Sequence, residues 1–344
     1  MGSPPVILVA GSEKSGKTSI IDVVFRKISA YKTYYQETTK TLQRQEVHHN
    51  PLFQYDVCEL PSNPLETTRD GIHLNPTYKS QLANVKLLIY IIDLDKYSSR
   101  SDPFGSKNTF NFRELLPELL ECNNDLLVSI FLHKTDINMS SEQLSNIQKS
   151  VQATVSDIYS TLDISPSTSY SRTCVFDYSI SEAISKVIQR LIPHRPVLLA
   201  LLNSFSQSSN IEKVYIFDTY CKICLAQDST PSDIGMYELC RDNIEVISDI
   251  HNIYNVDMNT NNNEMNSEGI HSEDTNNHSS NKSVNSITKL ERSHSTLGIY
   301  VYPCISNTVI VSILREEHFN KLGLIQYNLQ QLNESIQKLA TLEN

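Results

Sequence analysis

Short apolar runs recur along the first part of the chain. Three are almost wholly apolar, as strands covered on both faces of a sheet are, and a fourth fits an edge strand. The buried runs span residues 6–10, 86–93 and 126–133, and the edge run spans 53–60. Apolar residues recur at helical spacing over 18–29, 140–162 and 179–191. The alternation predicts an α/β unit with a mostly parallel sheet and helices on both faces.

Two of these helices carry start signals. Ser140 stands three residues before Gln143, and Ser179 stands three residues before Glu182. Both pairs match a capping box, in which each side chain accepts a hydrogen bond from the other's backbone N–H. Pro193 ends the second helix, because proline cannot continue it.

After residue 196 the order of the patterns changes. Helical spacing at 197–205 and 232–253 is followed in each case by two strand-like runs, and a helix closes the chain; the runs span 214–217, 222–226, 297–302 and 309–314. This order predicts an antiparallel α+β unit, so we expect two domains, 1–194 and 195–344. The segment at about 255–295 is rich in Asn and Ser and poor in apolar residues, which predicts a disordered insert.

The last helix carries an apolar stripe at alternating three- and four-residue steps. Its members are Leu322, Ile325, Leu329, Leu332, Ile336 and Leu339. Such a stripe forms either a coiled-coil seam for a partner or the buried face of a helix on its own sheet. Three heptads are short for a free coiled coil, so packing on the sheet is favoured.

Composition narrows the class of function. The 344 residues carry 29 Lys and Arg against 39 Asp and Glu, a formal net charge of −10. Binders of nucleic acid or anionic membranes need a basic surface, so neither is expected as a partner. No apolar run approaches the roughly 20 residues of a membrane span, and direct insertion is not expected. The seven scattered cysteines favour reduced thiols in the cytosol.

Residues 11–18, GSEKSGKT, match the phosphate-binding pattern GxxxxGK[ST] between a predicted strand and a predicted helix. Backbone N–H groups of such a loop, together with the helix N-terminus, bind phosphate oxygens. Lys17 is expected to reach the β- and γ-phosphates, and Thr18 to ligate Mg²⁺. The expected nucleotide-binding set is Gly11, Ser12, Glu13, Lys14, Ser15, Gly16, Lys17, Thr18 and Ser19.

The sequence HKTD at 133–136 suggests which base is bound. It follows a buried strand, at the sheet edge where ligands bind in α/β folds. Asp136 can accept both N1–H and the exocyclic amine of guanine, whereas adenine would leave the carboxylate unpaired. The stem of Lys134 can stack on the base. His133 stands where small GTPases usually carry Asn.

HKxD is typical of Rag GTPases, and the chain resembles that family along nearly its whole length, the Asn-rich insert apart. It looks most like the Rag C/Rag D branch and its fungal Gtr homologues. Both halves carry the resemblance, in stretches that include 36–39 (QETT), 88–93 (LIYIID), 173–177 (TCVFD), 211–213 (IEK) and 237–240 (YELC). The resemblance implies a Ras-like P-loop GTPase domain followed by a roadblock-like dimerisation domain.

The resemblance also implies ligands and site residues. The cofactors are GTP or GDP and Mg²⁺. Thr39 corresponds to the switch I threonine that ligates Mg²⁺ and senses the γ-phosphate, and Cys174 falls where a backbone N–H meets guanine O6.

Partners and location are likewise implied. They are a Rag A/B-type GTPase bound through the C-terminal domain, a lysosomal or vacuolar scaffold complex, and the target-of-rapamycin kinase complex, which receives the amino-acid signal. A cytosolic protein recruited to the lysosomal or vacuolar membrane is expected, with a nuclear pool as a further location.

Switch II departs from the usual DxxG followed by Gln, because residues 59–63 read ELPSN. Glu59 still offers a carboxylate toward Mg²⁺, so the expected metal ligands are Thr18, Thr39 and Glu59. Ser62 lacks the freedom of glycine, and Asn63 is one methylene shorter than Gln, so these catalytic candidates predict slow hydrolysis. Glu13 is expected to add negative charge near the γ-phosphate.

Two other readings remain open. The degenerate switch fits a pseudo-GTPase subunit that acts mainly as a scaffold. An unrelated P-loop kinase or ATPase would prefer ATP, and the sequence at 133–136 argues against it.

Overall fold

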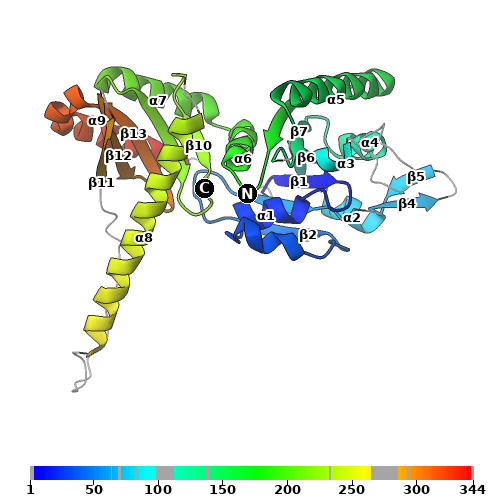
Figure 1. Ribbon diagram of the computed structural model, residues 1–344, viewed down its shortest axis with the longest axis horizontal. Coiled ribbons are helices and arrows are strands. Elements are labelled where there is room, and N and C mark those ends of the chain that lie inside the picture. Colours follow the sequence, from blue (N-terminus) through cyan, green and yellow to red (C-terminus); the bar gives the residue numbers. More distant parts are fainter. Residues whose placement is uncertain are drawn as a thin grey trace. The chain divides into compact units, whose positions relative to one another are not determined.

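The computed structural model describes residues 4–341 except 63, 69–70, 83, 98–111, 137–138, 232–233, 265–285 and 293–294. The chain divides into two compact units, Met1–Pro193 and His194–Glu343, each with its own sheet and core (Figure 1). Among the described residues, no helix combines the length and the apolar character that a membrane span requires.

The first unit is built on a six-stranded sheet with strand order β2-β3-β1-β6-β7-β8. The strands are β1 (Val6–Gly11), β2 (Gln43–Val47), β3 (Tyr55–Glu59), β6 (Val85–Asp93), β7 (Leu127–His133) and β8 (Thr168–Thr173). All neighbours pair in parallel except β2 and β3. The central strands β1, β6 and β7 are almost wholly buried, as strands inside a parallel sheet are. The predicted mostly parallel sheet is confirmed.

Helices cover this sheet. α4 (Phe112–Cys122) and α5 (Ser141–Leu162) pack their apolar stripes into one core with the strands, and α1 (Lys17–Val24) lies beside α6 (Ser179–Leu191). The shorter elements are η1 (Ala30–Tyr35), α2 (Pro76–Gln81), α3 (Leu94–Tyr97) and a hairpin of β4 (Leu65–Thr68) and β5 (Gly71–Leu74).

The two predicted capping boxes have different outcomes. At the start of α5, Ser140 Oγ accepts from the Gln143 N–H at 3.2 Å, and Gln143 Oε1 accepts from the Ser140 N–H at 2.8 Å, so this box is confirmed. At α6 the prediction is wrong. Tyr178 is the N-cap, and Ser179 is already helical. The Ser179 hydroxyl instead accepts from the Cys174 N–H at 2.9 Å.

The second unit holds a five-stranded antiparallel sheet with strand order β10-β9-β13-β12-β11. Its strands are β9 (Lys213–Asp218), β10 (Cys224–Gln227), β11 (Ser286–Arg292), β12 (Ser295–Pro303) and β13 (Thr308–Arg315). α8 (Ile234–Glu264) covers one face through Tyr237, Cys240 and Ile244. α7 (Arg195–Ser209) packs beside α9 (Leu322–Thr341), which follows η2 (Glu316–Lys321). The predicted antiparallel α+β order is confirmed.

The strand predicted at the edge of the first sheet lies inside it. β3 sits between β1 and β2, and all five of its residues are buried. β2 forms the edge instead. Its sequence, QRQEV, offers no apolar run to detect, and a polar strand suits a sheet edge.

Disorder was expected over about 255–295, and the structure places a helix and a strand at the two ends of this segment. α8 continues through residue 264, and β11 occupies residues 286–292 as the outermost strand beside β12. Extending an existing helix costs less than nucleating one, and the edge of β12 offers hydrogen-bonding partners to an added strand. The middle of the segment, 265–285, lies outside the described residues.

The apolar stripe of the terminal helix is buried within its own unit. Ile325, Leu329, Leu332 and Ile336 are buried, and Asn328 donates to Ser209 Oγ on α7 at 3.0 Å. The stripe is therefore not exposed as a coiled-coil seam; the prediction was packing on the sheet, and the helix beside α9 is α7.

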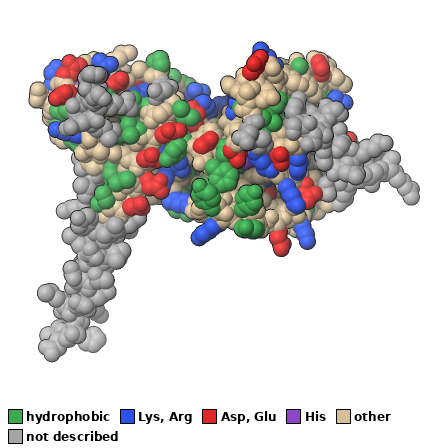
Figure 2. All heavy atoms as spheres, viewed as in Figure 1, with side chains coloured by type: hydrophobic (Ala, Val, Ile, Leu, Met, Phe, Trp, Pro, Cys, Tyr) green, Lys and Arg blue, Asp and Glu red, His purple; other side chains and the backbone are tan. Residues whose placement is uncertain are grey.

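Charged side chains of both signs are interspersed over the face shown in Figure 2, where the described residues form no continuous basic surface. The mixed surface agrees with the net charge of −10.

Candidate functional site

The phosphate loop connects β1 to α1. Gly11 and Gly16 both adopt positive φ, 153° and 100°. A Cβ on Gly11 would lie 2.6 Å from the carbonyl oxygen of Ile91, and one on Gly16 would lie 2.7 Å from Cδ2 of His133. Both backbone conformation and space therefore require glycine at these two positions.

Lys17 is the first residue of α1 and is buried. Its Nζ donates to the carbonyls of Gly11 and Ser12 at 3.0 and 2.9 Å, and to Ser62 Oγ at 3.4 Å. Burial lowers the pKa of Lys17 to about 8, although the Glu59 carboxylate acts in the opposite direction. The ammonium is thus held at the mouth of the loop, where the negative charge of a phosphate would offset the cost of burying it.

Three oxygen-bearing side chains from three different segments meet beside Lys17. Thr18 Oγ1 lies 2.6 Å from Glu59 Oε1 and 3.0 Å from Thr39 Oγ1, and Thr39 Oγ1 donates to Glu59 Oε1 at 2.8 Å. The other carboxylate oxygen, Glu59 Oε2, is buried without a hydrogen-bond partner. Two hydroxyls and a carboxylate with an unsatisfied oxygen are the donor set that Mg²⁺ prefers, so these residues fit the ion.

His133 packs its ring against Gly16 and ties the loop to the sheet. Its Nδ1 lies 2.9 Å from Thr173 Oγ1 at the end of the neighbouring strand β8. Burial lowers the pKa of His133 to about 4, with the nearby Lys134 charge adding to the effect. The imidazole is therefore neutral at pH 7 and forms part of the wall of the site.

The residues expected to contact the base lie at the ends of β7 and β8. Cys174 is buried, and burial raises the pKa of its thiol to about 11, so the protonated Sγ donates to Asp136 Oδ1 at 3.4 Å. The backbone N–H of Cys174 already donates to Ser179 Oγ. The structure thus gives Cys174 a side-chain contact with Asp136, whereas the next residue, Val175, lines the cavity.

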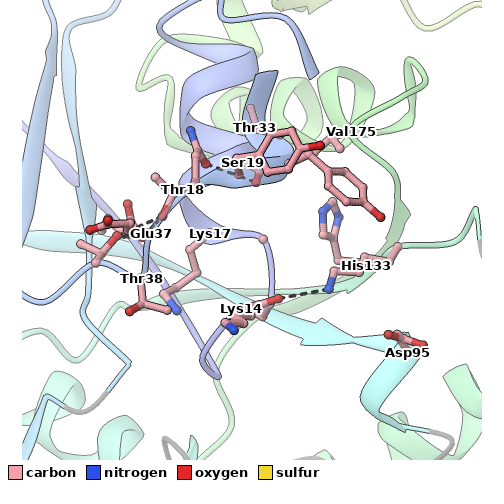
Figure 3. A pocket seen from close by; sticks show the side chains of 18 of the residues that line it. Lys14, Lys17, Thr18, Ser19, Thr33, Glu37, Thr38, Asp95, His133 and Val175 are labelled. Carbon is pink, nitrogen blue, oxygen red and sulfur yellow. Dashed lines mark hydrogen bonds between the residues drawn. The ribbon is translucent and has the colours of Figure 1, made fainter. Parts of the chain in front are cut away.

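These residues surround a cavity of about 640 Å³, shown in Figure 3 with Lys17 and Thr18 on one side and His133 on the other. Twelve of the residues predicted from the sequence line it: Lys14, Ser15, Gly16, Lys17, Thr18, Ser19, Thr39, Glu59, Ser62, His133, Lys134 and Asp136. Four predicted residues do not: Gly11, Ser12, Glu13 and Cys174. Asn63 lies outside the described residues.

Glu13 differs from the expectation in its placement. Its side chain is exposed and is not part of the cavity wall. Its charge is still felt at the site, where it acts to raise the pKa of Lys17.

Of the cavity wall contributed by η1 and the segment after it, only Thr39 was among the site residues chosen from the sequence. Thr33, Tyr34, Tyr35 and Gln36 line the cavity. Tyr31, also on η1, packs its ring against Phe176 at a centroid distance of 5.6 Å. Gln36 belongs to the stretch 36–39 that carries the family resemblance, whereas tyrosines in a polar loop carry no motif.

The chain is similar to known GTP-binding proteins. The Gtr1/RagA G protein conserved region matches residues 6–249. The chain is 30% identical over 338 residues to Ras-related GTP-binding protein C of Homo sapiens, covering 98% of this chain and 77% of that protein. It is 30% identical over 337 residues to GTP-binding protein gtr2 of Schizosaccharomyces pombe, covering 98% of each.

Other likenesses are weaker. Ras-related GTP-binding protein A of Dictyostelium discoideum is 23% identical over 240 residues, covering 67% of this chain and 73% of that protein. A solved structure of Myxococcus xanthus MglB covers 42% of this chain at 12% identity, with a TM-score of 0.31, which carries no inference.

The family match spans most of the chain, and the relatives at 30% identity are of the Rag C and fungal Gtr2 type, as the resemblance predicted. The sequence from the phosphate loop to Asp136 lies within the matched region. This chain belongs to the Gtr1/RagA family of GTP-binding proteins, on its Rag C/D-like branch.

Proposed function

We propose that this chain is a Rag-type switch subunit that binds GTP or GDP with Mg²⁺ and hydrolyses GTP slowly. The observation that carries the proposal is the meeting of Lys17, the Thr18–Thr39–Glu59 group and Asp136 around one cavity. A buried ammonium, a set of hard oxygen donors and an acceptor for a base are the three contacts that a nucleoside triphosphate needs.

Each residue has a separate role in this proposal. Lys17 binds the β- and γ-phosphates in place of the loop carbonyls that now receive its ammonium. Thr18, Thr39 and Glu59 hold Mg²⁺, which supplies electrostatic stabilisation of the phosphate oxygens when bound. Asp136, aligned by the Cys174 thiol, accepts two hydrogen bonds from guanine. Because Thr39 lies between η1 and β2, it couples nucleotide state to that segment.

Slow hydrolysis follows from the segment after Glu59. Ser62 replaces the flexible glycine, and its Oγ accepts from Lys17 Nζ at 3.4 Å. The chain then enters the β4–β5 hairpin, whose base is closed by the Asn75 N–H donating to the Pro64 carbonyl at 3.2 Å. Asn63, the residue next to Ser62, is one methylene shorter than the usual Gln, which supports slow activation of an attacking water. We expect an intrinsic rate at or below about 10⁻⁴ s⁻¹, the order known for Ras.

The second unit is proposed to be the roadblock-like dimerisation domain. It would join a Rag A/B-type partner, and the pair would signal amino-acid sufficiency to the target-of-rapamycin complex from a scaffold on the lysosome or vacuole. The relatives of the Rag C and Gtr2 type support this assignment. The alternative is a pseudo-GTPase scaffold subunit, which Ser62 and Asn63 favour.

A substitution at the base-binding residue tests the proposal. Replacing Asp136 by Asn reverses the hydrogen-bonding character that guanine requires, so Asp136→Asn should shift preference from GDP toward xanthosine diphosphate. Cys174→Ser, which keeps a donor to Asp136, serves as the matched control and should retain guanine preference. An unsubstituted chain with no preference for guanine over adenine would refute the assignment of the base site.

A further inference from the structure

Lys96 lies outside the nucleotide-binding motifs, yet it contacts the phosphate loop. It sits on α3, directly after β6, and its Nζ donates to the carbonyl of Glu13. Lys134, from the end of β7, donates to the next carbonyl, that of Lys14, at 3.1 Å. Two lysines from neighbouring strand ends therefore hold two successive carbonyls of the loop.

The two lysines share one buried carboxylate. Asp93 Oδ2 lies 2.8 Å from Lys134 Nζ and 3.9 Å from Lys96 Nζ. Asp93 is itself buried at the end of β6. The sheet edge thereby fixes both ammonium groups, and through them it fixes the loop.

The geometry of the peptide unit links the contact at the Glu13 carbonyl to the direction of the Lys14 N–H. In a trans peptide the C=O and the following N–H point in opposite directions. A lysine that draws the Glu13 carbonyl to one side turns the N–H of Lys14 to the other, and Lys14 lines the cavity. Lys14 has a φ of 58°, a left-handed conformation that a residue with a Cβ adopts under constraint. The carbonyl contacts on either side of Lys14 supply that constraint.

Lys96 also acts on the site through its charge. Burial is the main reason that the pKa of Lys17 is low, and the positive charge of Lys96 adds to the lowering. A phosphate between these two cations would be attracted by both. The exposed carboxylate of Glu13 works against this field.

We propose that Lys96 is a positioning residue of the phosphate loop, which holds the Glu13 carbonyl so that the Lys14 N–H faces the bound phosphates. This inference rests on the proposed guanine-nucleotide function. It assigns to Lys96 a role in slowing nucleotide release, in addition to the contact that Lys134 makes with the Lys14 carbonyl.

The test compares Lys96→Gln and Lys96→Arg with a matched surface control, Lys149→Gln, on the exposed side of α5. The readout is the dissociation rate of fluorescent GDP and GTP analogues from the full chain with Mg²⁺. Lys96→Gln should release both nucleotides about tenfold faster, the effect of losing one charged hydrogen bond. Lys96→Arg should restore the rate to within about threefold, and Lys149→Gln should leave it unchanged.

Two further readouts separate positioning from general damage. Guanine-over-adenine selectivity and the unfolding midpoint should be the same in Lys96→Gln as in the unsubstituted chain. A Lys96→Gln rate within twofold of the unsubstituted rate overturns the proposal, as does an equal loss in Lys96→Arg.

A separate measurement tests the role of Lys96 in the case that the proposed function is wrong. If the unsubstituted chain binds no guanine nucleotide, the proposed function is wrong, and Lys96 is then judged with magnesium pyrophosphate. The amide resonance of Lys14 should shift on adding pyrophosphate to the unsubstituted chain and should not shift in Lys96→Gln. Equal shifts in both proteins, or none in either, overturn the positioning role.

Discussion

Acidification should destabilise the first unit through His133. The imidazole is buried between Gly16 and Thr173, and burial lowers its pKa from 6.5 to about 4. Between these two values the unfolded chain binds a proton that the folded chain excludes, so stability falls as pH decreases. Each pKa unit corresponds to about 1.36 kcal/mol, and integration from pH 7 to pH 5 gives a loss of about 2 kcal/mol.

Urea unfolding at pH 7, 6 and 5 measures this loss. The comparison is between the unsubstituted chain and His133→Asn, which keeps a polar contact to Thr173 but cannot titrate. The difference in unfolding free energy between the two proteins should change by about 2 kcal/mol from pH 7 to pH 5, with the unsubstituted chain losing more. Because the other nine histidines are present in both proteins, their contributions cancel. A pH-independent difference would show that His133 is not held neutral in the folded state.

Substitutions at three positions test the site. Gly16→Ala should abolish nucleotide binding while leaving most of the fold intact, because its Cβ would lie 2.7 Å from His133 Cδ2; a titration with fluorescent GDP checks this, and affinity within threefold of the unsubstituted chain would contradict it. Glu59→Gln should remove most of the Mg²⁺ dependence of GDP affinity, since a neutral amide is a poorer Mg²⁺ ligand than a carboxylate; Mg²⁺ titrations of both proteins decide, and an unchanged Mg²⁺ requirement would place the ion elsewhere. Cys174→Ala should weaken GDP binding about three- to tenfold by releasing Asp136, whereas Cys174→Ser should not, and equal affinities for the two variants would remove the thiol from the base site.

Much of the fold follows from patterns that have strong physical causes. Buried parallel strands must be apolar on both faces, so β1, β6 and β7 can be recognised in the sequence as apolar runs. Edge strands carry no such requirement, which is why β2 gave no signal and β3 was assigned to the wrong position. β11 was missed for the same reason, since its order depends on backbone pairing with β12 rather than on its composition.

The candidate site likewise has one part that the local sequence specifies and another that only the tertiary structure brings together. The loop from Gly11 to Ser19 is specified by its own residues, because phosphate binding needs glycines, a lysine and a hydroxyl at fixed spacing. The meeting of Thr39 and Glu59 with Thr18 was predicted from the family resemblance alone, as these residues are 20 to 41 positions apart along the chain. Lys96 and the cavity wall from η1 belong to no motif, and only the tertiary structure brings them to the loop.

Binding of guanine nucleotide at the cavity between Lys17 and Asp136 underlies every role proposed for this chain. To test this binding directly, the chain is purified alone and together with a Rag A/B-type partner. Any nucleotide released on denaturation is identified. Each preparation is then titrated with GDP, GTP and ATP in the presence of Mg²⁺. We expect tight binding of GDP and GTP, weak binding of ATP, and loss of guanine binding in Lys17→Ala. Absence of guanine binding in both preparations, or equal affinity for ATP and GTP, would contradict it.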